Sequence, residues 1–134
     1  MDILKYKTAL ILLITALLFS TQTFAQYNPA PGDDVRHAFK ESYKHEKSGK
    51  ISKAIDVLNR VYNKNSYEIN LRLGYLSNLN KQYRESIYYY STAIGLMPMS
   101  IEARMGLANP VAAIEDWTTL ENNYNDILKI DPNN

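Results

Sequence analysis

The chain repeats one pattern of apolar and small side chains three times. Segments open at Ile51, Tyr83 and Trp117, each after a short polar break. Counted from each opening, the pattern recurs three, seven and ten residues later, and these offsets trace one face of an α-helix. The recurring positions are Ala54, Ser86 and Leu120; Leu58, Tyr90 and Tyr124; and Val61, Ala93 and Ile127. No later segment alternates like a convincing β-strand, so the pattern predicts an all-α chain.

The spacing of these segments predicts a repeat array. The three openings are nearly evenly spaced, and the separation of Tyr83 from Trp117 equals that of Pro98 from Pro132, two prolines that lie where a helix has to end. A unit of this length holds two amphipathic helices that cannot bury their apolar faces alone. Stacked units bury one continuous core between neighbours.

The repeated residues resemble the tetratricopeptide repeat (TPR) family, whose units are helix-turn-helix modules of about 34 residues with a Leu-Gly pair and set small, aromatic and proline positions. The residues that carry the resemblance are Ala54, Leu58, Leu73, Gly74, Ser86, Tyr90, Ala93, Pro98, Leu107, Ala108, Trp117, Tyr124 and Pro132. The resemblance implies a right-handed α-α solenoid of about three units and six helices. The units would span about residues 35–66, 67–100 and 101–134.

Several positions depart from the family pattern. Asn70 and Arg104 stand where the family has tryptophan, and Leu120 is large where the family has a small residue, so the last helix pair should pack wider or tilted. Pro110 lacks an amide hydrogen and predicts a kink or break within its helix. The repeat pattern also predicts a buried ring for Trp117.

Residues with short polar side chains mark the expected helix starts. Asp33 and Asp34 offer an N-cap and negative charge at the start of the first helix. Ser66 and Ser100 precede later helices, and a glutamate follows each of them two residues on. Such a cap with a nearby carboxylate contributes about 1 kcal/mol at each place.

The N-terminal segment is typical of a secretory signal. Two lysines precede an apolar run from Ala9 to Phe19, which is too short for a membrane-spanning helix of about 20 residues. We predict a signal peptide at residues 1–25, cleaved between Ala25 and Gln26, and a linker at residues 26–34. The protein would then be exported to the periplasm or the cell exterior without membrane insertion; an uncleaved anchor is the alternative.

Composition and charge exclude several classes of function. The 134 residues carry a formal net charge of +1, which argues against a polybasic nucleic-acid binder. The absence of cysteine excludes disulfides, a thiolate nucleophile and a zinc ribbon. Charge is nevertheless uneven: residues 36–64 hold eight basic and three acidic side chains, a local +5, whereas residues 101–134 hold two basic and six acidic ones, a local −4.

The sequence contains no recognisable catalytic constellation. His45 and Glu46 begin like a zinc-protease motif, but Gly49 stands where its second histidine would be. His37, Glu41 and His45 share one helix face and could form a weak surface metal site, although solvated polar side chains are the simpler interpretation. We therefore predict a protein that is not an enzyme and has no catalytic residue, cofactor or metal.

The resemblance implies a concave groove lined by the first helix of each unit, which would grip a peptide or a helix of another protein. Carried over, its residues are Phe39, Tyr43, Leu71, Tyr75, Asn78, Met105 and Asn109. Some family members hold a partner's terminal carboxylate with lysine and asparagine at the first two places of such sets. Here Phe39 with Tyr43, and Leu71 with Tyr75, stand at those places, so that clamp is absent. The alternative is that half of these side chains belong to the ordinary core between helices.

The resulting functional prediction is a protein-binding adaptor or scaffold of the bacterial envelope, with a partner of unknown identity. One alternative is a truncated recruitment or regulatory segment of a larger exported enzyme or sensor, because the sequence stops at Asn134, where a further repeat commonly follows in this family. Another is self-assembly, in which the basic first unit meets the acidic last unit of another copy through an uncapped end.

Overall fold

The computed structural model describes residues 32–133. The predicted signal peptide and its cleavage site lie outside these residues, as does the linker up to residue 31. No helix in the part that the structure describes is long and apolar enough to cross a membrane.

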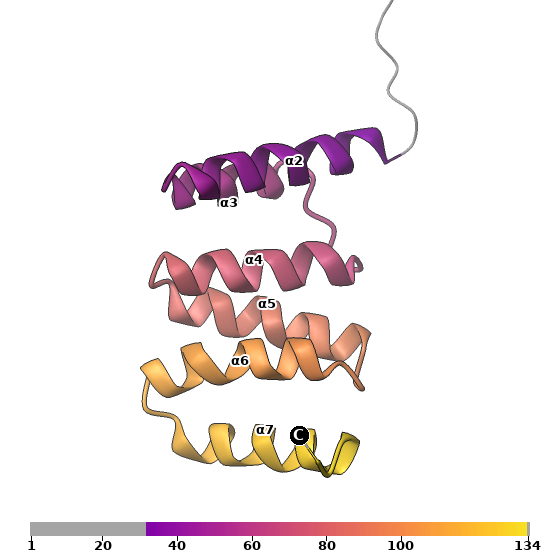
Figure 1. The fold of residues 1–134 in the computed structure, drawn as a ribbon, viewed down its shortest axis with the longest axis vertical. Helices are drawn as coiled ribbons and strands as arrows, with labels where there is room; N and C mark the ends of the chain where they lie inside the picture. The colour runs from indigo at the N-terminus through magenta and orange to yellow at the C-terminus, as the bar shows by residue number, and fades with distance from the viewer. Residues whose placement is uncertain (1–31, 134) are drawn as a thin grey trace, which may run out of the picture. The chain divides into compact units, whose positions relative to one another are not determined.

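Residues 32–133 form six helices and no strand, so the all-α prediction is confirmed. The helices are α2 (Asp33–Lys47), α3 (Ile51–Asn59), α4 (Tyr67–Leu79), α5 (Tyr83–Leu96), α6 (Ile101–Ala113) and α7 (Trp117–Ile130). Each helix packs against the next one along the chain, and α4 also contacts α6 (Figure 1). Three helical hairpins, α2–α3, α4–α5 and α6–α7, thus stack in chain order. This arrangement is compatible with a solenoid, and its right-handed sense stays a prediction.

The three hairpins are closed by the same type of turn. In each turn one residue has a left-handed backbone: Gly49 with φ 71°, Lys81 with φ 60° and Glu115 with φ 61°. The amide of the following residue reaches back five positions to a helix carbonyl, as in Lys50 to His45 at 2.9 Å. Such a turn satisfies carbonyls that a helix end leaves without partners. The three turn residues have the same spacing as the segment openings in the sequence, so the sequence period is also a period of backbone conformation.

Serine caps begin two of the helices as predicted. The Oγ of Ser66 accepts a hydrogen bond from the amide of Ile69 at 3.3 Å, and the Oγ of Ser100 accepts one from Ala103 at 3.0 Å. Helix α2 differs, because Gly32 occupies its N-cap and makes no side-chain cap. Asp33 and Asp34 instead lie in its first turn, where their charge still favours the positive helix end.

Asn70 and Arg104, which stand where tetratricopeptide repeats have tryptophan, make polar contacts. The Nδ2 of Asn70 donates to the carbonyl of Lys64 at 3.1 Å, and the Nε of Arg104 donates to that of Pro98 at 3.3 Å. Both the donors and the acceptors occupy equivalent places in successive repeats. Each side chain ties its helix to the segment that joins it to the preceding hairpin.

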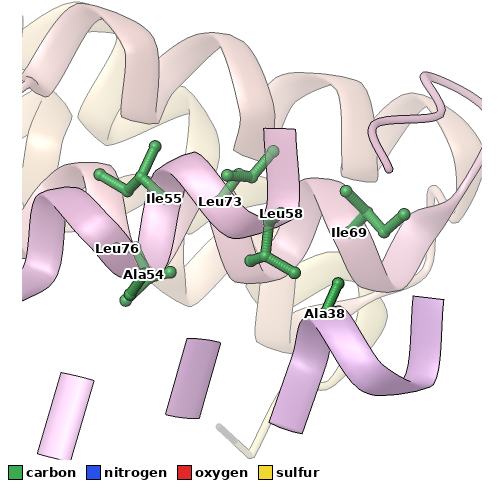
Figure 2. Close-up of a cluster of buried hydrophobic side chains, with 7 residues drawn as sticks. All are labelled: Ala38, Ala54, Ile55, Leu58, Ile69, Leu73 and Leu76. Carbon is green, nitrogen blue, oxygen red and sulfur yellow. The ribbon is translucent and has the colours of Figure 1, made fainter. Parts of the chain in front are cut away.

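The main core lies among α2, α3 and α4. Figure 2 shows its buried side chains, which are Ala38, Ala54, Ile55, Leu58, Ile69, Leu73 and Leu76. A second cluster, formed by Tyr90, Leu107 and Val111, lies between α5 and α6. Nine of the residues that carry the resemblance to tetratricopeptide repeats are buried, namely Ala54, Leu58, Leu73, Gly74, Ser86, Tyr90, Ala93, Leu107 and Ala108. The hydroxyl of Ser86 donates to the carbonyl of Gly74 at 2.7 Å, which joins α5 to α4.

The last hairpin differs from the sequence prediction in two respects. Helix α6 does not break at Pro110 but continues to Ala113, because proline removes only the hydrogen bond to Gly106 near the helix end. The buried ring predicted for Trp117 is wrong, since this residue is 61% exposed. Tyr124 is also exposed, whereas Leu120 is partly buried against the second cluster. Trp117 and Tyr124, seven residues apart, thus lie on a largely exposed face of α7.

Candidate functional site

A groove with a volume of about 800 Å³ runs across α2, α4 and α6. Most of its lining is apolar or aromatic, and a few acidic or basic side chains interrupt it. The lining residues are Phe39, Tyr43, Tyr67, Glu68, Leu71, Arg72, Tyr75, Tyr90, Glu102, Met105, Gly106 and Asn109.

The repeat period builds this groove. Four lining positions of α4 recur in α6 one repeat unit later, and along each helix they follow the spacing of one face. The pairs are Glu68 and Glu102, Leu71 and Met105, Arg72 and Gly106, and Tyr75 and Asn109. Equivalent faces of two stacked helices therefore form one continuous wall, and Phe39 and Tyr43 extend it onto α2.

A charged and aromatic network closes the α2 side of the groove. The guanidinium of Arg72, which is 8% exposed, donates through Nη2 to Glu46 of α2. The same carboxylate accepts a hydrogen bond from the hydroxyl of Tyr75 at 2.9 Å. The guanidinium carbon of Arg72 also lies 3.9 Å from the ring centre of Tyr43. Arg72 thus joins α4 to α2 by an ion pair and a cation–π contact.

These contacts shift two pKa values in opposite directions. Burial by itself would raise the pKa of Glu46, but hydrogen bonds from Arg72 and Tyr75 and the charge of Arg72 bring it below its ordinary value of 4.5. The hydrogen bond to Glu46, together with burial, raises the pKa of the Tyr75 hydroxyl. At neutral pH the network therefore contains a carboxylate, a guanidinium and a neutral phenol.

Arg72 nevertheless keeps one unsatisfied donor. Its Nε is buried and has no hydrogen-bond partner within residues 32–133. The network thus holds a nearly buried charged side chain beside the groove.

The ring of Tyr90 forms part of the groove from the α5 side. It lies against Gly74 of α4 and Gly106 of α6, where a Cβ would come within 2.9 Å and 2.3 Å of ring carbons. Burial, followed by the charges of Tyr75 and Glu102, raises the pKa of the Tyr90 hydroxyl to about 12. Because a Cβ at either position would clash with the ring, Gly74 and Gly106 are both required for Tyr90 to fit between the helices.

A single hydrogen bond ties the starts of α4 and α6 together at the groove. The hydroxyls of Tyr67 and Ser100 lie 2.7 Å apart. Ser100 also caps α6, so this contact joins the two first turns, which carry Glu68 and Glu102.

The structure brings six of the seven predicted groove residues together. Tyr43, Tyr75, Met105 and Asn109 are exposed lining residues, whereas Phe39 and Leu71 line the groove and are also partly buried against the core clusters. Asn78 does not line it. The alternative of ordinary core therefore applies in part to two side chains.

Other lining residues were not predicted, namely Tyr67, Glu68, Arg72, Tyr90, Glu102 and Gly106. The sequence carried a signal for one pair, because Glu68 and Glu102 occupy the same place in successive units. No such signal exists for Arg72. Its partner Glu46 lies in the preceding hairpin, and the two residues do not occupy equivalent positions of the repeat.

No protein-family model matches this chain. A search of curated proteins likewise finds no match. The groove therefore has to be interpreted from its own side chains.

The structure offers little support for a metal centre on α2. Glu41 pairs with Lys44 at 3.4 Å, and His37 lies exposed on the same helix. Over residues 32–133, no group of three or more histidine, aspartate or glutamate side chains is arranged to hold a metal ion.

Proposed function

We propose that this protein is a non-catalytic interaction module that binds a peptide segment or helix of a partner protein in the groove across α2, α4 and α6. The observation that carries this proposal is the groove of about 800 Å³ whose wall is built from equivalent positions on α4 and α6, the first helices of successive hairpins. Its repeat residues are similar to those of tetratricopeptide repeat proteins, which use the corresponding face to bind polypeptides. The composition of residues 1–25 favours a site of action in the periplasm or outside the cell.

The chemistry of the groove supports a polypeptide ligand. Tyr43, Tyr75 and Met105 are 54%, 40% and 45% exposed, so substantial aromatic and apolar surface remains for a partner to cover. Aromatic side chains with polar ends are enriched in protein interfaces because they combine a large contact area with hydrogen bonding. Asn109 adds an amide that can bond a polypeptide backbone.

A displayed library of random dodecapeptides, selected on the full-length protein, tests the proposal. The groove variant combines Met105→Ser, which removes an exposed apolar contact, with Asn109→Trp, which fills the groove. Its matched control combines Met99→Ser with Asn59→Trp, at exposed positions that do not line the groove. We expect peptide families that bind the wild type and the control but not the groove variant.

The proposal would be overturned if no peptide family depended on the groove residues. Far-ultraviolet circular dichroism of all three proteins separates loss of binding from loss of fold. Because both groove substitutions are at exposed positions, the helical signal should be unchanged.

Self-association is a second candidate function, and the exposed face of α7 favours it. Trp117, Tyr124 and Leu128 lie at offsets of seven and four residues, and each is at least 44% exposed. Large apolar side chains gathered on one exposed helix face are typical of an interaction surface. Sedimentation of the wild type and of Trp117→Ser with Tyr124→Ser tests this candidate: a concentration-independent monomer in both would remove it.

A further inference from the structure

Two carboxylates lie at the same end of the groove. Glu68 is in the first turn of α4 and Glu102 is in the first turn of α6, and both line the groove as exposed side chains. The hydrogen bond between Tyr67 and Ser100 holds these two turns together. The carboxylates thus occupy equivalent places one repeat apart, on a shared and braced edge.

Neither carboxylate is neutralised by a cation within residues 32–133. Glu68 accepts a hydrogen bond from the neutral hydroxyl of Ser66 at 3.1 Å, and Glu102 makes no ion pair in this part of the chain. Arg72 is the one cation among the described lining residues, and it is already paired with Glu46. The groove therefore combines an apolar wall with a negative end.

This combination selects among possible occupants. An acidic segment or a terminal carboxylate would bring like charges together at Glu68 and Glu102, which disfavours binding. A lysine or arginine side chain could lay its apolar stem along Leu71 and Met105 and place its cationic end beside the carboxylates. Tyr67 and Tyr90 also line the groove and offer aromatic surface for the rest of the segment.

We infer that the occupant of the groove is a polypeptide segment carrying a lysine or arginine next to an apolar anchor residue, with its cationic group at Glu68 and Glu102. This inference rests on the proposed function and adds the charge of the ligand. The site discriminates against acidic segments through the same two carboxylates.

The peptide selection tests the inference when it is repeated on Glu68→Gln with Glu102→Gln. These substitutions remove both charges and keep similar shape and hydrogen-bonding capacity. The control is Glu115→Gln with Glu121→Gln, which removes two exposed charges away from the groove and leaves the net charge equal to that of the variant. The dissociation constants of one selected peptide and of its lysine-to-glutamine form are then measured by fluorescence anisotropy.

We expect wild-type and control selections to be enriched in lysine or arginine beside an apolar residue, and the groove-charge variant to lose this preference. Removing both carboxylates should weaken binding of the basic peptide roughly fivefold, since exposed ion pairs contribute modestly. Binding of the glutamine peptide should be the same for all three proteins. The fivefold difference should also shrink at high salt, because the charges are exposed.

Two other results are distinguishable. Groove-dependent peptides that are neutral or acidic, or a basic preference that survives Glu68→Gln with Glu102→Gln, would overturn this inference and leave the proposed function intact. Selection of no groove-dependent peptide at all would overturn the proposed function and this inference with it.

Discussion

The ring of Tyr90 occupies the space that Gly106 leaves by lacking a side chain. A Cβ added at Gly106 would lie 2.3 Å from Cε1 of Tyr90, far inside the normal contact distance. Tyr90 belongs to α5 and Gly106 to α6, so this fit joins two neighbouring hairpins. The same ring lines the groove, and the packing of the repeat core therefore fixes part of the candidate site.

We expect Gly106→Ala to destabilise the protein by about 2 kcal/mol. Overpacking costs about 1–3 kcal/mol, and the higher helix propensity of alanine offsets only part of that loss. Gly95→Ala is the matched control, because Gly95 is also helical but a Cβ there would meet no atom within 4 Å. This control should gain roughly 0.5 kcal/mol. Urea unfolding followed by circular dichroism measures both, and equal stabilities for the two variants would contradict the fit.

The turns of the second and third hairpins predict stabilising substitutions. Lys81 and Glu115 adopt positive φ values, where a side chain costs about 1–2 kcal/mol compared with glycine. Glycine also makes the unfolded chain more flexible, which lowers the free energy of unfolding by about 0.4–1 kcal/mol and offsets part of this gain. Lys81→Gly and Glu115→Gly should each raise the free energy of unfolding by about 0.5 kcal/mol.

Gly49 provides the comparison for these two turns, since it already has glycine at the equivalent place and a φ of 71°. Gly49→Ala should lower stability by about 1 kcal/mol. A destabilising effect of glycine at both 81 and 115 would mean that the lysine and glutamate side chains stabilise these turns by contacts that their exposure does not suggest.

The helices and their pairing were predictable from the sequence because they follow from a period, and half of the groove lining was predictable because the resemblance to tetratricopeptide repeats implies it. Offsets of three, seven and ten identify a helix face, and the repeat spacing places Leu71 and Met105 at equivalent points of successive units. The structure then brings such positions together in one wall. The serine caps were predictable for a different reason, because the hydrogen bond that Ser66 accepts comes from Ile69, only three residues away.

What escaped prediction depends on partners distant in sequence. The ion pair between Arg72 and Glu46 joins α4 to α2, but the two residues do not occupy equivalent positions of the repeat. Nothing in the local sequence pattern marks this pair. Burial of Trp117 was predicted from its place in the pattern, but burial requires a neighbour, and the packing within residues 32–133 leaves this residue 61% exposed. The sequence pattern identifies which side chains share a helix face, but the packing of the helices determines whether that face is buried.

Exposure of Trp117 leads to a prediction opposite to the one its position suggests. A fully buried tryptophan would cost about 3–5 kcal/mol when replaced by alanine. Because its side chain is 61% exposed, we expect Trp117→Ala to lower the free energy of unfolding by less than about 1 kcal/mol. Leu58→Ala, at a completely buried position, should cost about 2–5 kcal/mol in the same assay. A comparable loss for both variants would show that the ring is covered in solution.

The network at Glu46 predicts how stability depends on pH. Its pKa is lowered in the folded protein, chiefly by Arg72 and Tyr75 against the opposing effect of burial. The unfolded chain therefore takes up this proton at a higher pH than the folded chain does. The carboxylate's contribution to the free energy of unfolding is complete above pH 4.5 and is lost as the pH falls through the folded-state pKa.

Glu46→Gln does not titrate, so the stability difference between wild type and this variant should be about 1–3 kcal/mol at neutral pH and shrink in acid. Urea unfolding of both proteins at neutral and acidic pH measures this difference, with Glu121→Gln as a control on the exposed surface of α7. A constant difference at every pH would mean that the charge of Glu46 does not stabilise the link between α2 and α4.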